Sequence, residues 1–243
     1  MSNPILNENF GANTTILEGE TMSVNGTIQK TLLMLLMVVL SAGYTWGLTV
    51  QGFIDKAQLL GIVGSVVALI AIIVMYFSKK TSWIWASVYS IGEGFFLGII
   101  SYAFNKFYPG IVAQAVACTF ASMFSMLMLY RAGIIKCTDK FRSIIMTAML
   151  SVLLIYIIQF VASIFGRSIP QIFTASPIGI GFSCIVVLIA SFGFIMDFDF
   201  IEQGAERMAP KYWEWMGAVG LMTSIVWLYV EMLKLLAKLN SRN

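Results

Sequence analysis

Three acidic residues interrupt long apolar stretches of this 243-residue chain, where carboxylates can carry protons or bind metal ions. Glu93 lies in YSIGEGFFLG, Asp197 lies in SFGFIMDFDF, and Glu231 lies in VWLYVEMLKL. An ionised carboxylate at bilayer depth costs a few kcal/mol or more, so such residues normally face a bundle interior or a water-filled cavity. The three acids therefore predict an ion or proton pathway.

The composition predicts a membrane protein. Hydrophobic residues make up 59% of the chain and charged residues only 11%, whereas soluble domains carry about 25% charged residues. The net charge of +3 is small, and Lys and Arg fall in short loops without a basic stripe that contains aromatic residues. Nucleic-acid binding is therefore not expected.

Histidine is absent from the chain. A Ser-His or Cys-His dyad, an HExxH zinc helix and a histidine proton relay are all excluded as a result. The three cysteines are scattered and have no disulfide or metal-binding spacing. We expect a protein without enzymatic activity or a resident cofactor.

Seven stretches reach the roughly 20 apolar residues that a membrane span needs. They predict an all-α polytopic membrane protein, a seven-transmembrane-helix bundle formed by residues 30–243, after a polar and disordered tail at residues 1–29. Ser176 and Pro177 predict the N-cap and first turn of the sixth span, and Pro210 is expected to open the seventh. The predicted spans are 31–52, 57–78, 83–104, 109–130, 143–165, 177–197 and 214–236.

Lys and Arg are unevenly divided between the two sides of the predicted bundle. On the side of the N-terminus lie Lys30, Lys79, Lys80, Arg131, Lys136, Lys140, Arg142, Arg207 and Lys211. On the other side lie Lys56, Lys106 and Arg167, with Lys234, Lys238 and Arg242 at the C-terminus. Because short basic loops stay in the cytoplasm, the N-terminus is predicted to be cytoplasmic and the C-terminus outside.

Asp197 has two interpretations from sequence. It either faces the bundle near the end of the sixth span or forms an interfacial pair with Arg207 or Lys211. Asp199 points about 200° away from it on a helix and shares a face with Glu202, which predicts a solvated position.

Glu231 and Glu93 also have two interpretations each. Glu231 either lines the pathway or pairs with Lys234 three residues later. Glu93 has no basic neighbour in sequence, so it is either a buried protonated acid or faces water or a partner side chain.

The C-terminal part of the chain resembles the Bax inhibitor-1 family. The resemblance lies in GFIMDFDFI at 193–201 and LYVEMLKLL at 228–236, and SIGEGFFLG at 90–98 fits a bacterial branch. It covers about residues 30–238. It implies a seven-helix bundle acting as a pH-sensitive calcium leak channel, in which Asp197 and Glu231 take the positions of the family's proton-sharing acidic pair.

Two departures from the family pattern concern this pair. Glu replaces Asp at position 231, and the interval between the two acids is longer by about two helical turns. The longer interval argues against direct contact between Asp197 and Glu231. Glu214 or Glu93 is an alternative second carboxylate, and Asp199 is an alternative to Asp197.

The expected function is a pH-gated Ca²⁺ leak in a bacterial cytoplasmic membrane. Asp197 and Glu231 would offer oxygen ligands for a weak Ca²⁺ site, since Ca²⁺ takes 6–8 such ligands. A proton-coupled secondary transporter remains an alternative, because carboxylates serve proton exchange equally well. A further alternative is a regulatory partner of membrane proteins or proteases that transports nothing; membrane lipid is the other expected partner.

Overall fold

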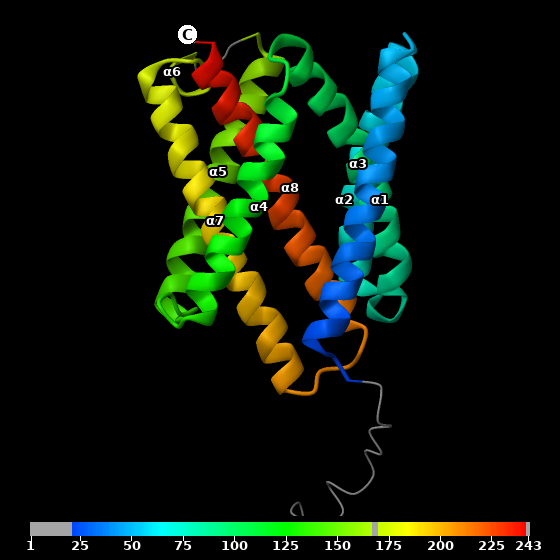
Figure 1. The fold of residues 1–243 in the computed structure, drawn as a ribbon, viewed down its shortest axis with the longest axis vertical. Coiled ribbons are helices and arrows are strands. Elements are labelled where there is room, and N and C mark those ends of the chain that lie inside the picture. Colours follow the sequence, from blue (N-terminus) through cyan, green and yellow to red (C-terminus); the bar gives the residue numbers. More distant parts are fainter. Residues whose placement is uncertain (1–20, 167–169, 242–243) are drawn as a thin grey trace, which may run out of the picture.

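The computed structural model describes residues 21–166 and 170–241, which form a bundle of long helices (Figure 1). The helices run between an N-side end, where α1 begins, and a C-side end, where α8 ends. In chain order they are α1 (Val24–Val50), α2 (Ile54–Phe77), the 3₁₀ turn η2 (Lys79–Thr81), α3 (Ser82–Phe107), α4 (Ile111–Arg131), α5 (Asp139–Ile164), α6 (Pro170–Phe173), α7 (Pro177–Glu206) and α8 (Trp213–Asn240).

Seven of the described helices have the length and apolar composition that a membrane span requires. The shortest of them, α4, has 21 residues, which is about 31 Å of helix and enough to cross a hydrocarbon core of about 30 Å. Large hydrophobic side chains such as Leu40, Leu69 and Phe160 are about two-thirds exposed on the outer surface. A surface of this kind suits lipid, and the predicted all-α bundle of seven spans is confirmed.

Two span boundaries differ from the sequence prediction. α1 begins at Val24, inside the predicted 1–29 tail, whereas residues 1–20 lie outside the described residues. α7 continues to Glu206, nine residues beyond the predicted end of the sixth span, because the amphipathic stretch 198–206 packs one face on the bundle.

The predicted start of α7 is confirmed, and that of α8 is not. The Ser176 hydroxyl accepts a hydrogen bond from the Gly179 amide at 3.0 Å, as an N-cap does. Pro210 precedes the first residue of α8, Trp213, whose amide donates to the Pro210 carbonyl at 2.9 Å.

Small residues bring α3 close to its neighbours. A Cβ on Gly92 would collide with the carbonyl oxygen of Gly64 on α2, and a Cβ on Gly94 or Gly98 would collide with the backbone of α1. Only glycine permits such close backbone approach. The helices α1, α2 and α3 therefore form one tightly packed unit.

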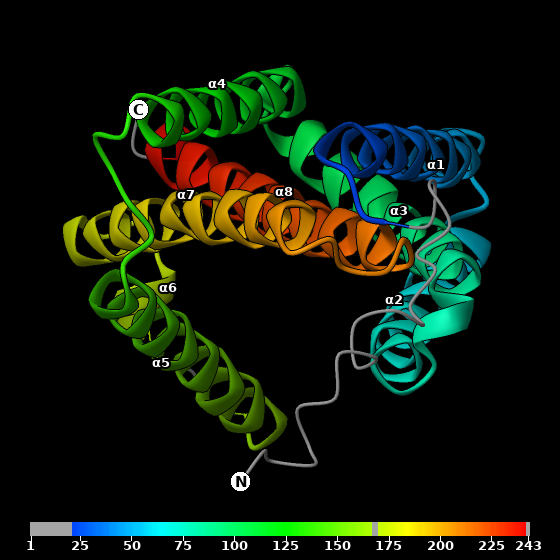
Figure 2. The same ribbon diagram turned by 90° about the horizontal axis from the view of Figure 1, so that it is seen from below.

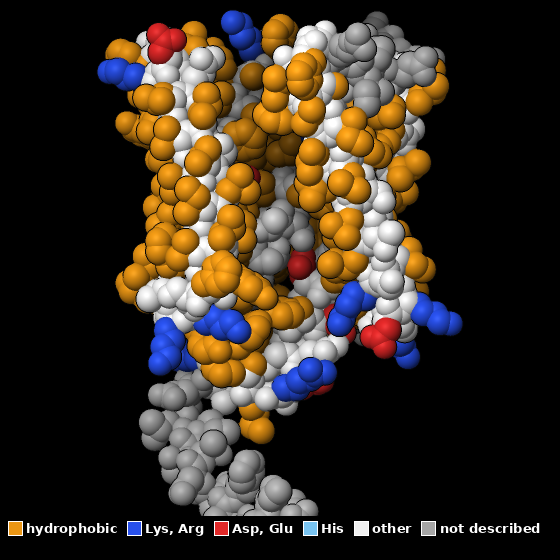
Figure 3. All heavy atoms as spheres, turned by 180° about the vertical axis from the view of Figure 1, so that it is seen from behind, with side chains coloured by type: hydrophobic (Ala, Val, Ile, Leu, Met, Phe, Trp, Pro, Cys, Tyr) orange, Lys and Arg blue, Asp and Glu red, His pale blue; other side chains and the backbone are white. Residues whose placement is uncertain are grey.

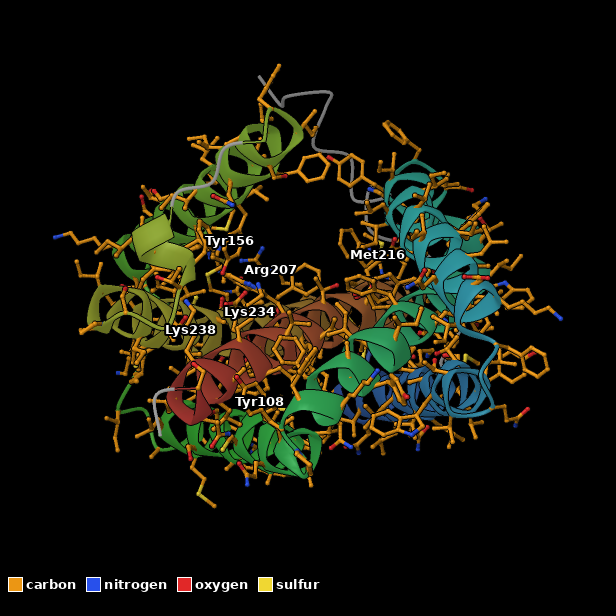
Figure 4. The ribbon with its side chains drawn as sticks, turned by 90° about the horizontal axis from the view of Figure 1, so that it is seen from above. Tyr108, Tyr156, Arg207, Met216, Lys234 and Lys238 are labelled. Atoms are coloured by element: carbon orange, nitrogen blue, oxygen red, sulfur yellow. The ribbon has the colours of Figure 1, made fainter. Side chains whose placement is uncertain are left out.

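The last helix lies at the centre of the bundle. α8 contacts α1, α3, α4 and α7, and Met222, Leu228 and Leu233 on it are fully buried. By contrast, α5 packs against α7 and has only two buried side chains, Ile145 and Val152. The views along the bundle axis show α5 standing apart from α2 across a gap, with α7 and α8 along one side of that gap (Figures 2 and 4).

Candidate functional site

Two cavities follow one another along the face of the bundle between α2 and α5. The N-side cavity, about 780 Å³, is lined by Lys79, Arg142, Asp197, Arg207 and Gly220 among others. The C-side cavity has a volume of about 440 Å³, and its lining includes Glu93, Tyr156, Glu231 and Lys234. We call the two together the lateral cleft.

The two cavities are adjacent steps along the same helices. On α2, Tyr76 lines the N-side cavity and Ile72 lines the C-side cavity. On α8, Gly220 lines the N-side cavity and Thr223 lines the C-side cavity. About one helical turn therefore separates the two cavities. Seen from behind, this face is hollowed between two columns of hydrophobic side chains, and acidic atoms are visible inside (Figure 3).

The C-side cavity brings Glu93 of α3 and Glu231 of α8 to one space. Glu231 is only 1% exposed. Its Oε1 accepts from the Lys234 ammonium at 2.9 Å, and its Oε2 accepts from the Tyr156 hydroxyl at 2.8 Å. The pairing with Lys234 that the sequence offered as one interpretation therefore exists, but within the bundle and on the wall of a cavity.

Glu93 contrasts with Glu231 in its contacts. No ion pair or hydrogen bond to its side chain is formed by any residue that the structure describes. The hydroxyls of Tyr89 and Thr223 line the same cavity and are 3.2 Å apart. Glu93 therefore presents an unpaired carboxyl group to a cavity that also holds oxygen donors from α3, α5 and α8.

Asp197 lies in the N-side cavity, at its boundary with the C-side cavity. Its Oδ2 is buried and has no hydrogen-bond partner in the described part of the chain. On α8, Ser224 is its polar neighbour, and a Cβ on Gly220 would lie 3.5 Å from its Oδ1. The predicted bundle-facing position is therefore the observed one, and neither Arg207 nor Lys211 pairs with Asp197.

The structure does not bring Asp197 and Glu231 together. Asp197 contacts α8 near Ser224, and seven residues of helix, about 10 Å, separate Ser224 from Glu231. One Ca²⁺ cannot bind both carboxylates at this separation, because Ca²⁺–oxygen distances are about 2.3–2.6 Å. The described residues also contain no group of three or more acidic, cysteine or histidine side chains arranged to hold a metal.

The sequence predicted a solvated position for Asp199, and this prediction is wrong. It is 9% exposed, and its Oδ2 accepts from Arg142 of α5 at 2.6 Å and from Gln203 at 2.7 Å. Glu202 is exposed as predicted and accepts from the Tyr130 hydroxyl. The sequence does not reveal the burial of Asp199, because its partner Arg142 comes from a different helix.

Replacing Asp199 by Asn should destabilise the fold by about 1–2 kcal/mol, because it breaks a partly buried ion pair that ties α5 to α7. A loss of this size lowers the midpoint of thermal unfolding by a few degrees. Glu206→Gln, at an exposed position of the same helix, is the matched control. Equal midpoints for the two variants in detergent would show that the pair does not hold α5.

Glu214 is not a second member of the acidic pair. It is 1% exposed and accepts from the amide and the hydroxyl of Ser23 at 2.9 Å each, and it forms an ion pair with Lys30. A Cβ on Gly26 would collide with its carboxylate. Together with the bond from the Met22 amide to the Ala209 carbonyl at 2.7 Å, these contacts fasten the start of α1 to the start of α8.

Two further polar side chains at the C-side end make contacts between helices that the sequence does not predict. Tyr156 links α5 to α8 through its hydrogen bond to Glu231. Lys238 donates to the carbonyls of Ile172 and Gly179 and to the hydroxyl of Ser183, at 2.8–3.0 Å (Figure 4). A tyrosine or lysine inside an apolar stretch is the only signal that the sequence offers for such residues.

The comparison with known families agrees with this architecture. The family model described as Bax inhibitor 1 like matches residues 3–241, nearly the whole chain and including the start of α1. No curated protein matches the sequence. A match of this length, on a bundle of seven apolar helices, shows that the chain is an integral membrane protein and belongs to the Bax inhibitor-1-like family.

Proposed function

We propose that the protein is a pH-sensitive cation leak, with Ca²⁺ as its principal divalent ion, and that the lateral cleft is its pathway. The observation that carries this proposal is that Glu93 and Glu231, from different helices, line one cavity at membrane depth. Buried carboxylates that face a cavity within the membrane mark ion or proton routes. The role is transport rather than catalysis.

The C-side cavity has the donor types that Ca²⁺ prefers. Two carboxylates and the hydroxyls of Tyr89, Tyr156 and Thr223 line it, and Ca²⁺ takes oxygen ligands in flexible arrangements. Lys234 already neutralises Glu231 in part, which favours weak and reversible binding. This is the behaviour of a leak rather than of a storage site.

The acids on the cleft also support control by protons. The buried Oδ2 of Asp197 has no hydrogen-bond partner among the described residues, so a change of charge on this carboxyl group has nothing beside it to compensate it. The hydrogen bond from Tyr156 to Glu231 and the ion pair of Arg142 with Asp199 connect α5 to α8 and α7. We infer that Asp197 is the proton-sensitive group of the cleft, whereas Glu231 joins the cavity wall to α5 through Tyr156.

A proton-coupled secondary transporter is the second candidate. It is favoured by the position of Asp197, at the boundary between a cavity toward the N-side end and one toward the C-side end. Ca²⁺ uptake into proteoliposomes, compared with empty liposomes across pH, tests the proposal. Uptake that does not saturate supports the leak, saturable counterflow supports the transporter, and the absence of uptake supports a non-transporting partner of other membrane proteins.

We further propose that the N-side end is cytoplasmic, in a bacterial cytoplasmic membrane. The basic residues of the loops gather at this end, as the sequence predicted (Figure 3). Of the basic residues at the C-terminus, Lys234 and Lys238 are held by internal acceptors and therefore count less as exposed loop charges.

A cysteine placed at Asp139, the first residue of α5 after the basic loop that follows α4, tests this orientation. In a background that lacks the three native cysteines, it should resist a membrane-impermeant thiol reagent in intact cells and react once the cells are permeabilised. A cysteine at Asp55, in the first turn of α2 at the opposite end of the bundle, is the control and should react from outside. Labelling at position 139 in intact cells would reverse the proposed orientation.

A further inference from the structure

Basic side chains from three separate segments line the N-side cavity. They are Lys79 of η2, Arg142 of α5 and Arg207, which follows α7. All three lie near the ends of membrane spans, at the level of a membrane surface. The cavity therefore has a cationic rim at the N-side end.

Two of these charges lack an acidic partner. Arg142 is paired with Asp199, whereas the Lys79 ammonium lies 5.2 Å from the ring centre of Trp213. The Arg207 side chain has neither an ion pair nor a hydrogen bond among the residues that the structure describes. Lys79 and Arg207 are thus available to an anion.

The α2 wall of the cleft is apolar and faces the lipid. Tyr76 and Phe77 at the end of α2 are 67% and 80% exposed beside the cavity opening. Farther along α2, Ile72 and Leu69 line the C-side cavity together with Trp227. Viewed along the axis, Tyr156, Lys234, Arg207 and Met216 border the same opening (Figure 4). An occupant that fits must be anionic at one end and hydrocarbon along its length.

We propose that the lateral cleft binds an anionic phospholipid. Its phosphate lies between Lys79 and Arg207, and one acyl chain follows α2 past Ile72 and Leu69. Leu69 lies eight residues before Phe77, the last residue of α2, so this path extends for about 12 Å into the hydrocarbon core. Basic pockets between membrane helices are known to bind the headgroups of anionic lipids.

The acids near the cleft are compatible with this placement. Asp197 is ten residues before Arg207 on α7, so it lies about 15 Å deeper than the rim. Asp199 is neutralised by Arg142, and Glu202 and Glu206 are exposed and do not line the cavity. No carboxylate of the described residues is therefore placed against the proposed phosphate.

Native mass spectrometry of the full chain in neutral detergent tests the proposal, with phosphatidylglycerol as the probe and phosphatidylcholine as its zwitterionic counterpart. Phosphatidylglycerol should be retained preferentially. The double variant Lys79→Gln/Arg207→Gln should bind it about 30-fold more weakly, since each basic residue contributes about 1 kcal/mol. The matched control is Lys80→Gln/Lys211→Gln, which removes two exposed charges from the same segments outside the cavity.

Three outcomes would overturn the assignment. Equal retention of phosphatidylcholine would show that only acyl chains bind. Equal losses in the two double variants would show diffuse surface attraction, and displacement by an equal concentration of inorganic phosphate would show a site for free anions. The unfolding midpoints of both variants establish that they are folded. The measurement needs no ion flux, so its result does not depend on whether the proposed function is correct.

Discussion

Glu231→Gln is expected to lower Ca²⁺ uptake into proteoliposomes about tenfold or more. The substitution keeps the size of the side chain but leaves the Lys234 ammonium uncompensated beside the cavity. Two unit charges 4 Å apart interact by about 4 kcal/mol at an effective dielectric constant of 20, and about 1.4 kcal/mol is enough for a tenfold change in rate. Uptake is measured with a Ca²⁺ indicator enclosed in the liposomes.

Two companion variants separate charge from structure. Tyr156→Phe removes only the hydrogen bond from α5 to Glu231 and should give a smaller loss of uptake. Glu206→Gln removes an exposed acid outside the cleft and should leave uptake unchanged. Wild-type uptake in a folded Glu231→Gln protein would exclude the C-side cavity from the pathway.

Asp197→Asn should remove most of the pH dependence of uptake. Asp197 lies at the boundary of the two cavities, and its buried Oδ2 has no partner among the described residues, so a change of its charge is felt along the pathway. Asparagine is nearly isosteric and cannot exchange a proton. Uptake compared between about pH 5 and pH 8 should vary strongly for the wild type and little for the variant.

Asp199→Asn is the matched comparison for this prediction. Its carboxylate is held by Arg142 and Gln203 rather than facing the boundary of the cavities, so the pH profile of uptake should keep its shape even though the fold is less stable. A flattened profile for Asp199→Asn together with a normal one for Asp197→Asn would transfer the proton-sensitive role to Asp199.

The seven spans were predictable from sequence because a lipid-facing helix must be apolar over most of its length. The continuation of α7 over residues 198–206 was visible only as an amphipathic stretch beyond the span, and the packing of Asp199 against α5 was not visible at all. The start of α1 was missed for a similar reason. Its first turns are held by Glu214, which is nearly two hundred positions away in sequence.

The candidate site was predictable in its residues but not in its pairings. An acid in an apolar stretch is visible in sequence, and so is the short-range pair of Glu231 with Lys234. The contacts of Arg142 with Asp199 and of Tyr156 with Glu231 join different helices. The shared cavity of Glu93 and Glu231 likewise depends on how α3 and α8 pack, which local patterns do not encode.

The most direct test of the account is Ca²⁺ uptake by Glu93→Gln beside the wild type in matched proteoliposomes. Glu93 has no described ion pair or hydrogen bond whose loss would disturb the fold, so its substitution reports on the cavity itself. The account predicts uptake well above that of empty liposomes for the wild type, and a severalfold loss in a Glu93→Gln protein with an unchanged unfolding midpoint. Equal uptake by the two proteins, or no uptake by either, would contradict it.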